Sequence, residues 1–168
     1  MASAYKLIKT HTTTSSVSSV LISTIPQSFQ DLKLVVSARS SAAQEDDALY
    51  VKFNSAATTY YSQVMFDNGG SVYGFRLTSA YAGVITANTS DANIFSNSDI
   101  YIAGYASSTK NKAAVTSTTN ETTSSNIRHD QAQLNWRSTA PITELLIEAG
   151  AGNIMSGSTF YLYGISNS

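Results

Sequence analysis

The sequence predicts an all-β protein: a single-domain antiparallel β-sandwich, jelly-roll-like, of about eight to ten strands over residues 1–168. Three observations support this fold class. Short segments rich in β-branched and aromatic residues recur along the chain, with turn-forming residues between them. Segments with the apolar period of a helix are scarce. Finally, 42% of the 168 residues are hydrophobic, enough for one domain with a sizeable core.

The N-terminal half begins with a polar segment and continues as strands. We expect residues 1–16 to form a flexible N-terminal arm, because the stretch 11–16 is polar. Apolar and β-branched runs predict strands at residues 17–22, 32–39, 49–53 and 60–66. Residues 67–71, Asp-Asn-Gly-Gly-Ser, are a strong turn signal, so residues 72–77 can pair back across this turn.

The C-terminal half also consists of predicted strands, two of them ambiguous. Residues 100–105 predict a strand, and residues 131–137 alternate so that Trp136 anchors the core. The polar, Thr-rich stretch 111–125 could be a long loop or an exposed strand, and we favour a hairpin arm or a sheet edge. Residues 141–150 could form a short helix with Pro near its start, but their length favours a strand.

The chain closes on the stretch GSTFYLYGIS, residues 157–166, which is apolar on both faces when read at the period of a strand. One face carries Phe160, Leu162 and Gly164, and the other carries Tyr161, Tyr163 and Ile165. A strand without a polar face is covered on both sides. We therefore expect this strand to be central in the sandwich, with its tyrosine face against a loop or a neighbouring subunit.

Composition excludes several classes of function. Charged residues make up only 12% of the chain, about half the usual share, while 27 serines and 19 threonines supply hydroxyls. The formal net charge of −1 offers no basic field, so we expect no nucleic-acid partner and no membrane partner. Cysteine is absent, which removes disulfides and thiolate chemistry. No continuous apolar segment opens the chain as a secretory signal would, so we expect synthesis in a cytoplasm.

The few residues that could carry catalysis have no supporting pattern. His11 lies in a polar stretch, and His129 lacks a positioned nucleophile, since no G-x-S-x-G motif occurs. Glu144 and Glu148 would lie about 13 Å apart on a strand, farther than a glycosidase pair requires, although a helix would bring them together. We therefore predict no enzyme and no catalytic residue.

Ligand motifs are equally weak. The acidic cluster at residues 45–47 could bind Ca²⁺ weakly, but a solvated turn is favoured because no D-x-D-x-D-G spacing is present. Gly150 and Gly152 have the spacing of a phosphate-binding loop, but Met155 stands where the third glycine belongs. A turn between strands explains these glycines better. We predict no metal site and no cofactor.

Tyrosine is abundant and lysine sparse, as in the buried centres of protein interfaces. Six tyrosines on predicted strands are candidate interface residues: Tyr60, Tyr61, Tyr101, Tyr105, Tyr161 and Tyr163. Each of them could also be half-buried filler within a sheet. As a set they predict an adhesive sheet face unless a partner covers it.

Two segments resemble a group of small structural proteins of tailed bacteriophages. These segments are SSVLISTIPQSFQDLKLVVSARS, residues 18–40, and ITELLIEAGAGNIMSGSTFYLYGIS, residues 142–166. The matching positions are Ile25, Pro26, Phe29, Asp31, Leu32 and Arg39, then Gly157, Ser158, Phe160, Leu162, Tyr163, Gly164 and Ile165. The resemblance implies a jelly-roll-like sandwich, usually oligomeric, on the outside of a capsid or on the tail. An ion pair between Asp31 and Arg39 is one option.

We therefore expect a non-enzymatic virion protein. The first hypothesis is a capsid decoration or cement protein that bridges capsid subunits, with the major capsid protein or other virion proteins as partners. A homo-oligomer is expected, and a trimer is favoured. The alternative is a receptor- or carbohydrate-binding module on a tail fibre or tail tip, in which exposed tyrosines stack on sugars.

Overall fold

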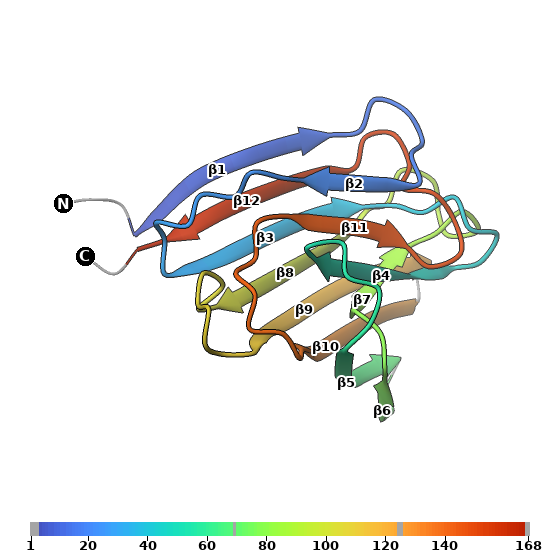
Figure 1. The fold of residues 1–168 in the computed structure, drawn as a ribbon. Helices are drawn as coiled ribbons and strands as arrows, with labels where there is room; N and C mark the ends of the chain where they lie inside the picture. Colours follow the sequence, from blue (N-terminus) through green and yellow to red (C-terminus); the bar gives the residue numbers. More distant parts are fainter. Residues whose placement is uncertain (1–3, 69, 124–125, 167–168) are drawn as a thin grey trace.

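The computed structural model describes residues 4–68, 70–123 and 126–166 and confirms the all-β sandwich (Figure 1). The described residues form twelve strands, slightly more than the sequence predicts. They are β1 (Tyr5–Thr12), β2 (Ser19–Ile22), β3 (Asp31–Ala38), β4 (Asp46–Phe53), β5 (Tyr60–Asn68), β6 (Val72–Leu77), β7 (Tyr81–Thr86), β8 (Ser96–Ala103), β9 (Lys112–Thr123), β10 (Asn126–Trp136), β11 (Leu145–Ala149) and β12 (Thr159–Ile165). No helix long and apolar enough to cross a membrane occurs in these ranges.

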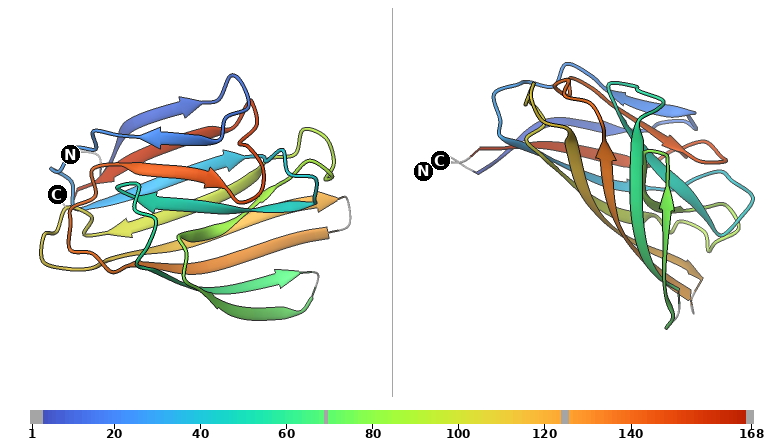
Figure 2. Two further views of the ribbon diagram at one scale, coloured as in Figure 1. Left: turned by 45° about the vertical axis from the view of Figure 1, so that its right-hand side comes forward. Right: turned by 60° about the horizontal axis from the view of Figure 1, so that its bottom comes forward.

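The strands form two antiparallel sheets of unequal size. The large sheet has eight strands in the order β1-β12-β3-β8-β9-β10-β5-β6, and the small sheet has four in the order β2-β11-β4-β7. The small sheet lies against one face of the large sheet, and the hairpin β5–β6 projects beyond it (Figures 1 and 2). One face of the large sheet is therefore left without a second layer.

The core between the sheets comes from alternating inward side chains. In β3 and β4 every second residue is buried, as the period of a half-buried strand requires. Trp136 is 5% exposed and packs against Phe53 and Tyr60, with ring centroids 6.0 and 6.2 Å away. This confirms Trp136 as a core anchor.

The closing strand β12 lies inside the large sheet, between β1 and β3. Phe160 and Leu162 on its inner face are completely buried. Gly164 lies directly beneath the Phe29 ring, so a Cβ at position 164 would overlap that ring. The strand is thus covered on its core side by the sandwich and by the loop that carries Phe29.

The Gly164→Ala substitution should destabilise the protein by about 1–3 kcal/mol, because the partly buried Phe29 ring must move to admit the new methyl group. Gly74→Ala is the matched control in β6, where the nearest atom to a new Cβ is the Val64 carbonyl oxygen at 3.5 Å. Urea denaturation of both variants measures the difference. Equal stability of the two variants would contradict this account of Gly164.

The predicted flexible arm is wrong over residues 5–12, which form β1. This strand pairs with β12 in a register that joins Tyr5 to Ile165 and His11 to Phe160. The physical reason is that β12 has two hydrogen-bonding edges and β3 occupies only one of them. Residues 1–3 of the predicted arm lie outside the described residues.

The Thr-rich stretch 111–125 forms β9, which makes a hairpin with β10 as predicted but does not lie at an edge, because β8 pairs with its other side. Most of its inner side chains are buried polar groups, and two of them hydrogen-bond to neighbouring strands. Thr118 donates to Ser98 Oγ at 3.1 Å, and Asn120 Oδ1 accepts from Thr86 Oγ1 at 2.7 Å. Residues 124–125 lie outside the described residues.

The segment at residues 141–150, for which the sequence allowed a helix or a strand, contains a strand. Its regular element is β11, as the length of the segment indicated.

Asp31 and Arg39 do not form an ion pair with each other. Asp31 accepts hydrogen bonds from the Tyr101 hydroxyl at 2.6 Å and the Gly104 amide at 2.7 Å. The Arg39 guanidinium instead donates to backbone carbonyl oxygens of the loop before β8, 2.7 to 3.0 Å away.

Candidate functional site

The candidate site is the face of the large sheet that points away from the small sheet, called the outer face below. Strand register places its side chains in rows that cross the sheet. One row contains Tyr161, Val35, Asp99, Ser117, Gln131 and Met65. The next row contains Tyr163, Lys33, Tyr101, Val115, Gln133 and Gln63. With strands about 4.8 Å apart, six neighbours span about 24 Å.

Large apolar side chains are exposed across the outer face. Val115, near its centre on β9, is 57% exposed, and Met65 on β5 is 56% exposed. The others are Tyr5, Leu7, Tyr61, Val72, Tyr101, Ile127 and Tyr161, each at least 38% exposed. Single exposed apolar residues are ordinary, but a group of this size on one face marks an interaction surface.

The polar groups between these side chains are mostly uncharged. The side-chain amides of Gln63, Gln131, Gln133, Asn97 and Asn135 make no hydrogen bond with any described residue. Lys33 and Asp99 lie 3.3 Å apart and neutralise each other. The outer face therefore offers apolar contact and unused hydrogen-bonding groups with little net charge.

Shallow, open depressions adjoin one another on the outer face. The first is lined mainly by Gln63, Met65, Val115, Gln131 and Gln133. The second shares Val115 and adds Tyr5, Lys33, Asp99, Tyr101, Thr116 and Ser117. The third shares Asp99 and Ser117 and adds Val35, Asn97, Ser98 and Thr119. Open depressions of this kind suit the surface of a macromolecule better than a small molecule, which usually binds in an enclosed pocket.

Four of the six tyrosines predicted as interface residues lie on the outer face. Tyr61, Tyr101 and Tyr161 are 45%, 41% and 38% exposed, and Tyr163 is half-buried beside them. The hydrogen bond from Tyr101 to the Asp31 carboxylate raises the pKa of Tyr101 to about 12, so this hydroxyl remains a donor.

Tyr60 and Tyr105 are wrong as interface candidates because both are buried. Tyr60 is 1% exposed, and its hydroxyl accepts from the Phe53 amide at 2.6 Å. Burial raises the pKa of Tyr60 to about 12. Tyr105 is fully buried and donates to the Pro26 carbonyl oxygen. Consecutive residues of a strand point to opposite faces, so Tyr60 and Tyr61 could not share the same face.

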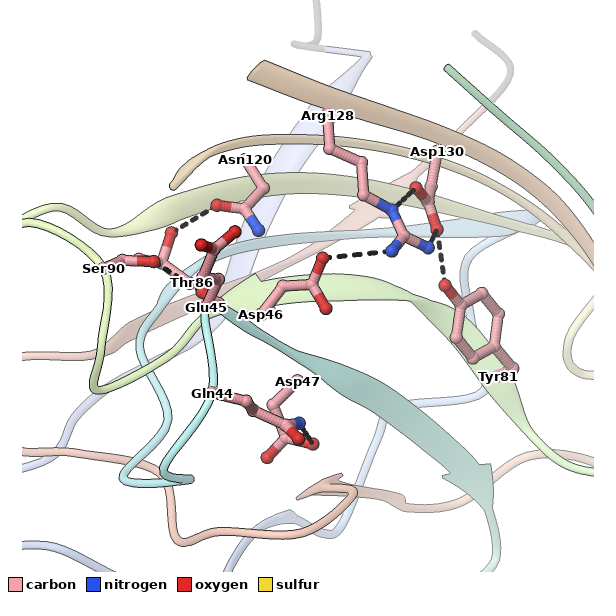
Figure 3. Close-up of polar contacts among 10 residues, drawn as sticks. All are labelled: Gln44, Glu45, Asp46, Asp47, Tyr81, Thr86, Ser90, Asn120, Arg128 and Asp130. Atoms are coloured by element: carbon pink, nitrogen blue, oxygen red, sulfur yellow. Dashed lines mark hydrogen bonds and ion pairs between the residues drawn. The ribbon is translucent and has the colours of Figure 1, made fainter. Parts of the chain in front are cut away.

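A polar network between the sheets fixes the strands behind the outer face (Figure 3). Asp130 on β10 is fully buried, and Arg128 donates to it from Nε at 2.7 Å and Nη2 at 3.2 Å. Arg128 Nη1 also reaches the Asp46 carboxylate on β4 at 3.0 Å. The Tyr81 hydroxyl on β7 donates to Asp130, and burial followed by this carboxylate raises the pKa of Tyr81. The network joins both sheets.

The acidic cluster at residues 45–47 is not the solvated turn that the sequence suggests. Asp47 is 2% exposed and accepts from Ser40 Oγ at 2.6 Å and from the Gly152 amide at 3.0 Å. The Ala151 amide donates to it as well. The glycine-rich turn at residues 150–152 thus binds the protein's own carboxylate. No group of three His, Cys, Asp or Glu residues that could hold a metal ion occurs in the described part of the chain.

The residues considered for catalysis have structural partners. His129 Nδ1 lies 3.3 Å from Thr119 Oγ1, and His11 lies beside the Phe160 ring, with centroids 6.2 Å apart. Glu148 pairs with Lys52 at 2.5 Å, and Glu144 accepts from Ser55 Oγ at 2.6 Å. Glu144 and Glu148 thus have separate partners and do not form a carboxylate pair.

The protein is thus a β-sandwich in which one broad, nearly uncharged and partly apolar sheet face is exposed. Comparisons with protein-family models, with curated proteins and with solved structures found no match to this chain.

Proposed function

We propose that the chain is a non-enzymatic structural protein of a tailed-phage virion, and specifically a capsid decoration protein that binds the capsid surface through its outer face. The observation that carries this proposal is the outer face itself, in which exposed aromatic, Val and Met side chains alternate with unpaired amides. Interface centres are enriched in aromatic residues and Met and depleted in Lys and Glu.

The size of the outer face fits this role. Eight strands at a spacing of about 4.8 Å and about six residues along each strand give an area of about 38 Å by about 20 Å, roughly 760 Å². A stable protein interface buries about 800 Å² on each partner. The outer face is thus large enough to span a junction between capsid subunits. Many copies, each bound weakly, would together stabilise the capsid.

The direct test is co-sedimentation of the purified protein with capsids assembled from the major capsid protein alone. We expect saturable binding that raises the temperature at which the capsids break open. Absence of binding at protein concentrations of about 10 µM, well above a micromolar Kd, would contradict the proposal.

A second candidate is favoured by the depression that contains Tyr101. Its exposed ring, with Asp99 and Ser117 nearby, resembles a site where an aromatic ring stacks on a sugar while polar groups bind its hydroxyls. A carbohydrate-binding tail module would be retarded in gels containing a neutral polysaccharide, and Tyr101→Ala would abolish the retardation. Retardation without capsid binding would favour this candidate over decoration.

A further inference from the structure

Strand β6 is an edge strand of the large sheet whose only charged residue is Arg76. Its six residues pair with β5 on one side, without a bulge, and it is the last strand in the order. It contains neither Lys nor Pro, and its side chains include Val72 at 70% and Tyr73 at 53% exposure. An exposed, regular and hydrophobic edge strand is a template for another strand.

The other edges are protected. At the opposite end of the large sheet, β1 carries Lys6, Lys9 and His11, and its pairing with β12 is interrupted between Leu7 and Lys9. In the small sheet, β2 has only four residues, and β7 is buried along its whole length. Among the four strands at sheet edges, β6 alone combines length, regularity and exposed apolar side chains.

The inner face of the β5–β6 hairpin is also incompletely covered, because this hairpin projects beyond the small sheet (Figure 2). Phe66 stacks on Tyr73 with ring centroids 5.1 Å apart, and it meets Phe75 at 5.7 Å. The Arg128 guanidinium lies over the Phe66 ring at 4.5 Å. Phe66, Phe75 and Leu77 are only partly buried, so the apolar row reaches the unpaired edge.

We propose that β6 pairs antiparallel with β6 of a second copy of this chain about a two-fold axis at Phe75. Residues directly opposite each other in a continuous sheet share a face. This register therefore places Phe75 opposite Phe75 of the second copy, and Tyr73 opposite Leu77 of the second copy. The inner apolar row continues across the junction, and the same patch serves on both copies, as two-fold symmetry requires.

The charges near the edge also fit a second copy. On the outer side of the same register, Arg76 lies opposite Gly74 of the second copy, which has no side chain to block it. Arg76 makes no ion pair within the described residues. Asp67, on the neighbouring strand β5, pairs in register with Val72. In this register the Cα of Asp67 in the second copy would lie about 12 Å from the Cα of Arg76. The Arg76 side chain is long enough to bring its guanidinium within the range of electrostatic attraction to the Asp67 carboxylate.

The test is sedimentation equilibrium at a protein concentration of about 50 µM, which gives the molecular mass in solution. The mass of the wild type is compared with the masses of two lysine variants. We expect a dimer for the wild type. Tyr73→Lys places two lysines in the junction and should raise the dimer Kd by at least about 100-fold. The matched control is Tyr5→Lys, because Tyr5 lies on the opposite edge strand with 52% exposure against 53% for Tyr73. This control should remain dimeric, and Tyr73→Phe should too.

Circular dichroism of both lysine variants establishes that they fold, so loss of the dimer is not loss of the protein. A monomeric wild type would overturn the proposal, and so would a trimer, since two-fold edge pairing closes at two copies. Dissociation by Tyr5→Lys but not by Tyr73→Lys would also overturn it. The measurement contains no capsid, so its outcome is independent of the decoration proposal.

Discussion

Replacing Asp130 by alanine lowers the free energy of unfolding by about 3–5 kcal/mol. Asp130 is fully buried and accepts two hydrogen bonds from Arg128 and one from the Tyr81 hydroxyl. Without the carboxylate, the Arg128 charge keeps its ion pair with Asp46 and its contact with the Phe66 ring, and the buried Tyr81 hydroxyl loses its acceptor. The cost is that of leaving these groups unpaired in the interior.

The matched control for this variant is Asp99→Ala, which removes a carboxylate from an exposed ion pair. Lys33 and Asp99 lie 3.3 Å apart with side chains 31% and 56% exposed, so solvent screens their attraction. The expected loss is below about 1 kcal/mol. Urea denaturation followed by tryptophan fluorescence reports both variants through Trp136. Similar losses for the two variants would show that the Asp130 network does not join the sheets as described.

The Val115→Glu variant should weaken capsid binding by at least about 30-fold. Val115 lies at the centre of the outer face and is 57% exposed, so it contributes little to the fold of the free protein. On the capsid this position would be covered, and a carboxylate there must lose its water without a partner. A central contact in an interface is worth about 2 kcal/mol or more, which corresponds to this factor.

The matched control is Leu21→Glu on β2, which introduces the same charge on the exposed side of the small sheet, where Leu21 is 49% exposed. Its capsid binding should stay within about threefold of the wild type, as for a contact outside the interface. Co-sedimentation with capsids compares the two directly. If Leu21→Glu loses binding while Val115→Glu retains it, the capsid-binding surface lies on the small sheet.

The fold class was predictable because strand signals act locally. The alternation at residues 131–137 identified the inward face of β10, and the turn at residues 67–71 identified the β5–β6 hairpin. Both signals lie within a few residues of the structure they specify. Such signals have a limit at the closing strand, which was predicted to be covered on both sides. Its core side is buried, but Tyr161 on its other face is 38% exposed, because the large sheet has no second layer there (Figure 1).

The errors arose where a partner lies far away in the sequence. Polarity suggested an exposed β9, but Asn120 is buried because Thr86, 34 residues earlier, hydrogen-bonds to it. Asp47 looked solvated, but amides more than 100 residues later surround it. A polar side chain is buried without large cost when a partner is supplied, and a single sequence does not show that partner.

The outer face could be predicted only in part for a similar reason. Tyrosine composition identified Tyr61, Tyr101, Tyr161 and Tyr163, but Met65 and Val115 went unnoticed. Their importance depends on register, which places β9, β10 and β5 side by side. Strand order in a sheet of eight strands is a long-range property, and local pattern does not determine it.

We propose that the outer face attaches this protein to a capsid lattice in many copies. The most direct measurement is the copy number per purified virion, obtained by quantitative mass spectrometry against the major capsid protein. Decoration predicts hundreds of copies in a fixed ratio to the capsid lattice. A count of only a few copies per virion would contradict decoration and would instead assign the tyrosine-bearing outer face to the tail.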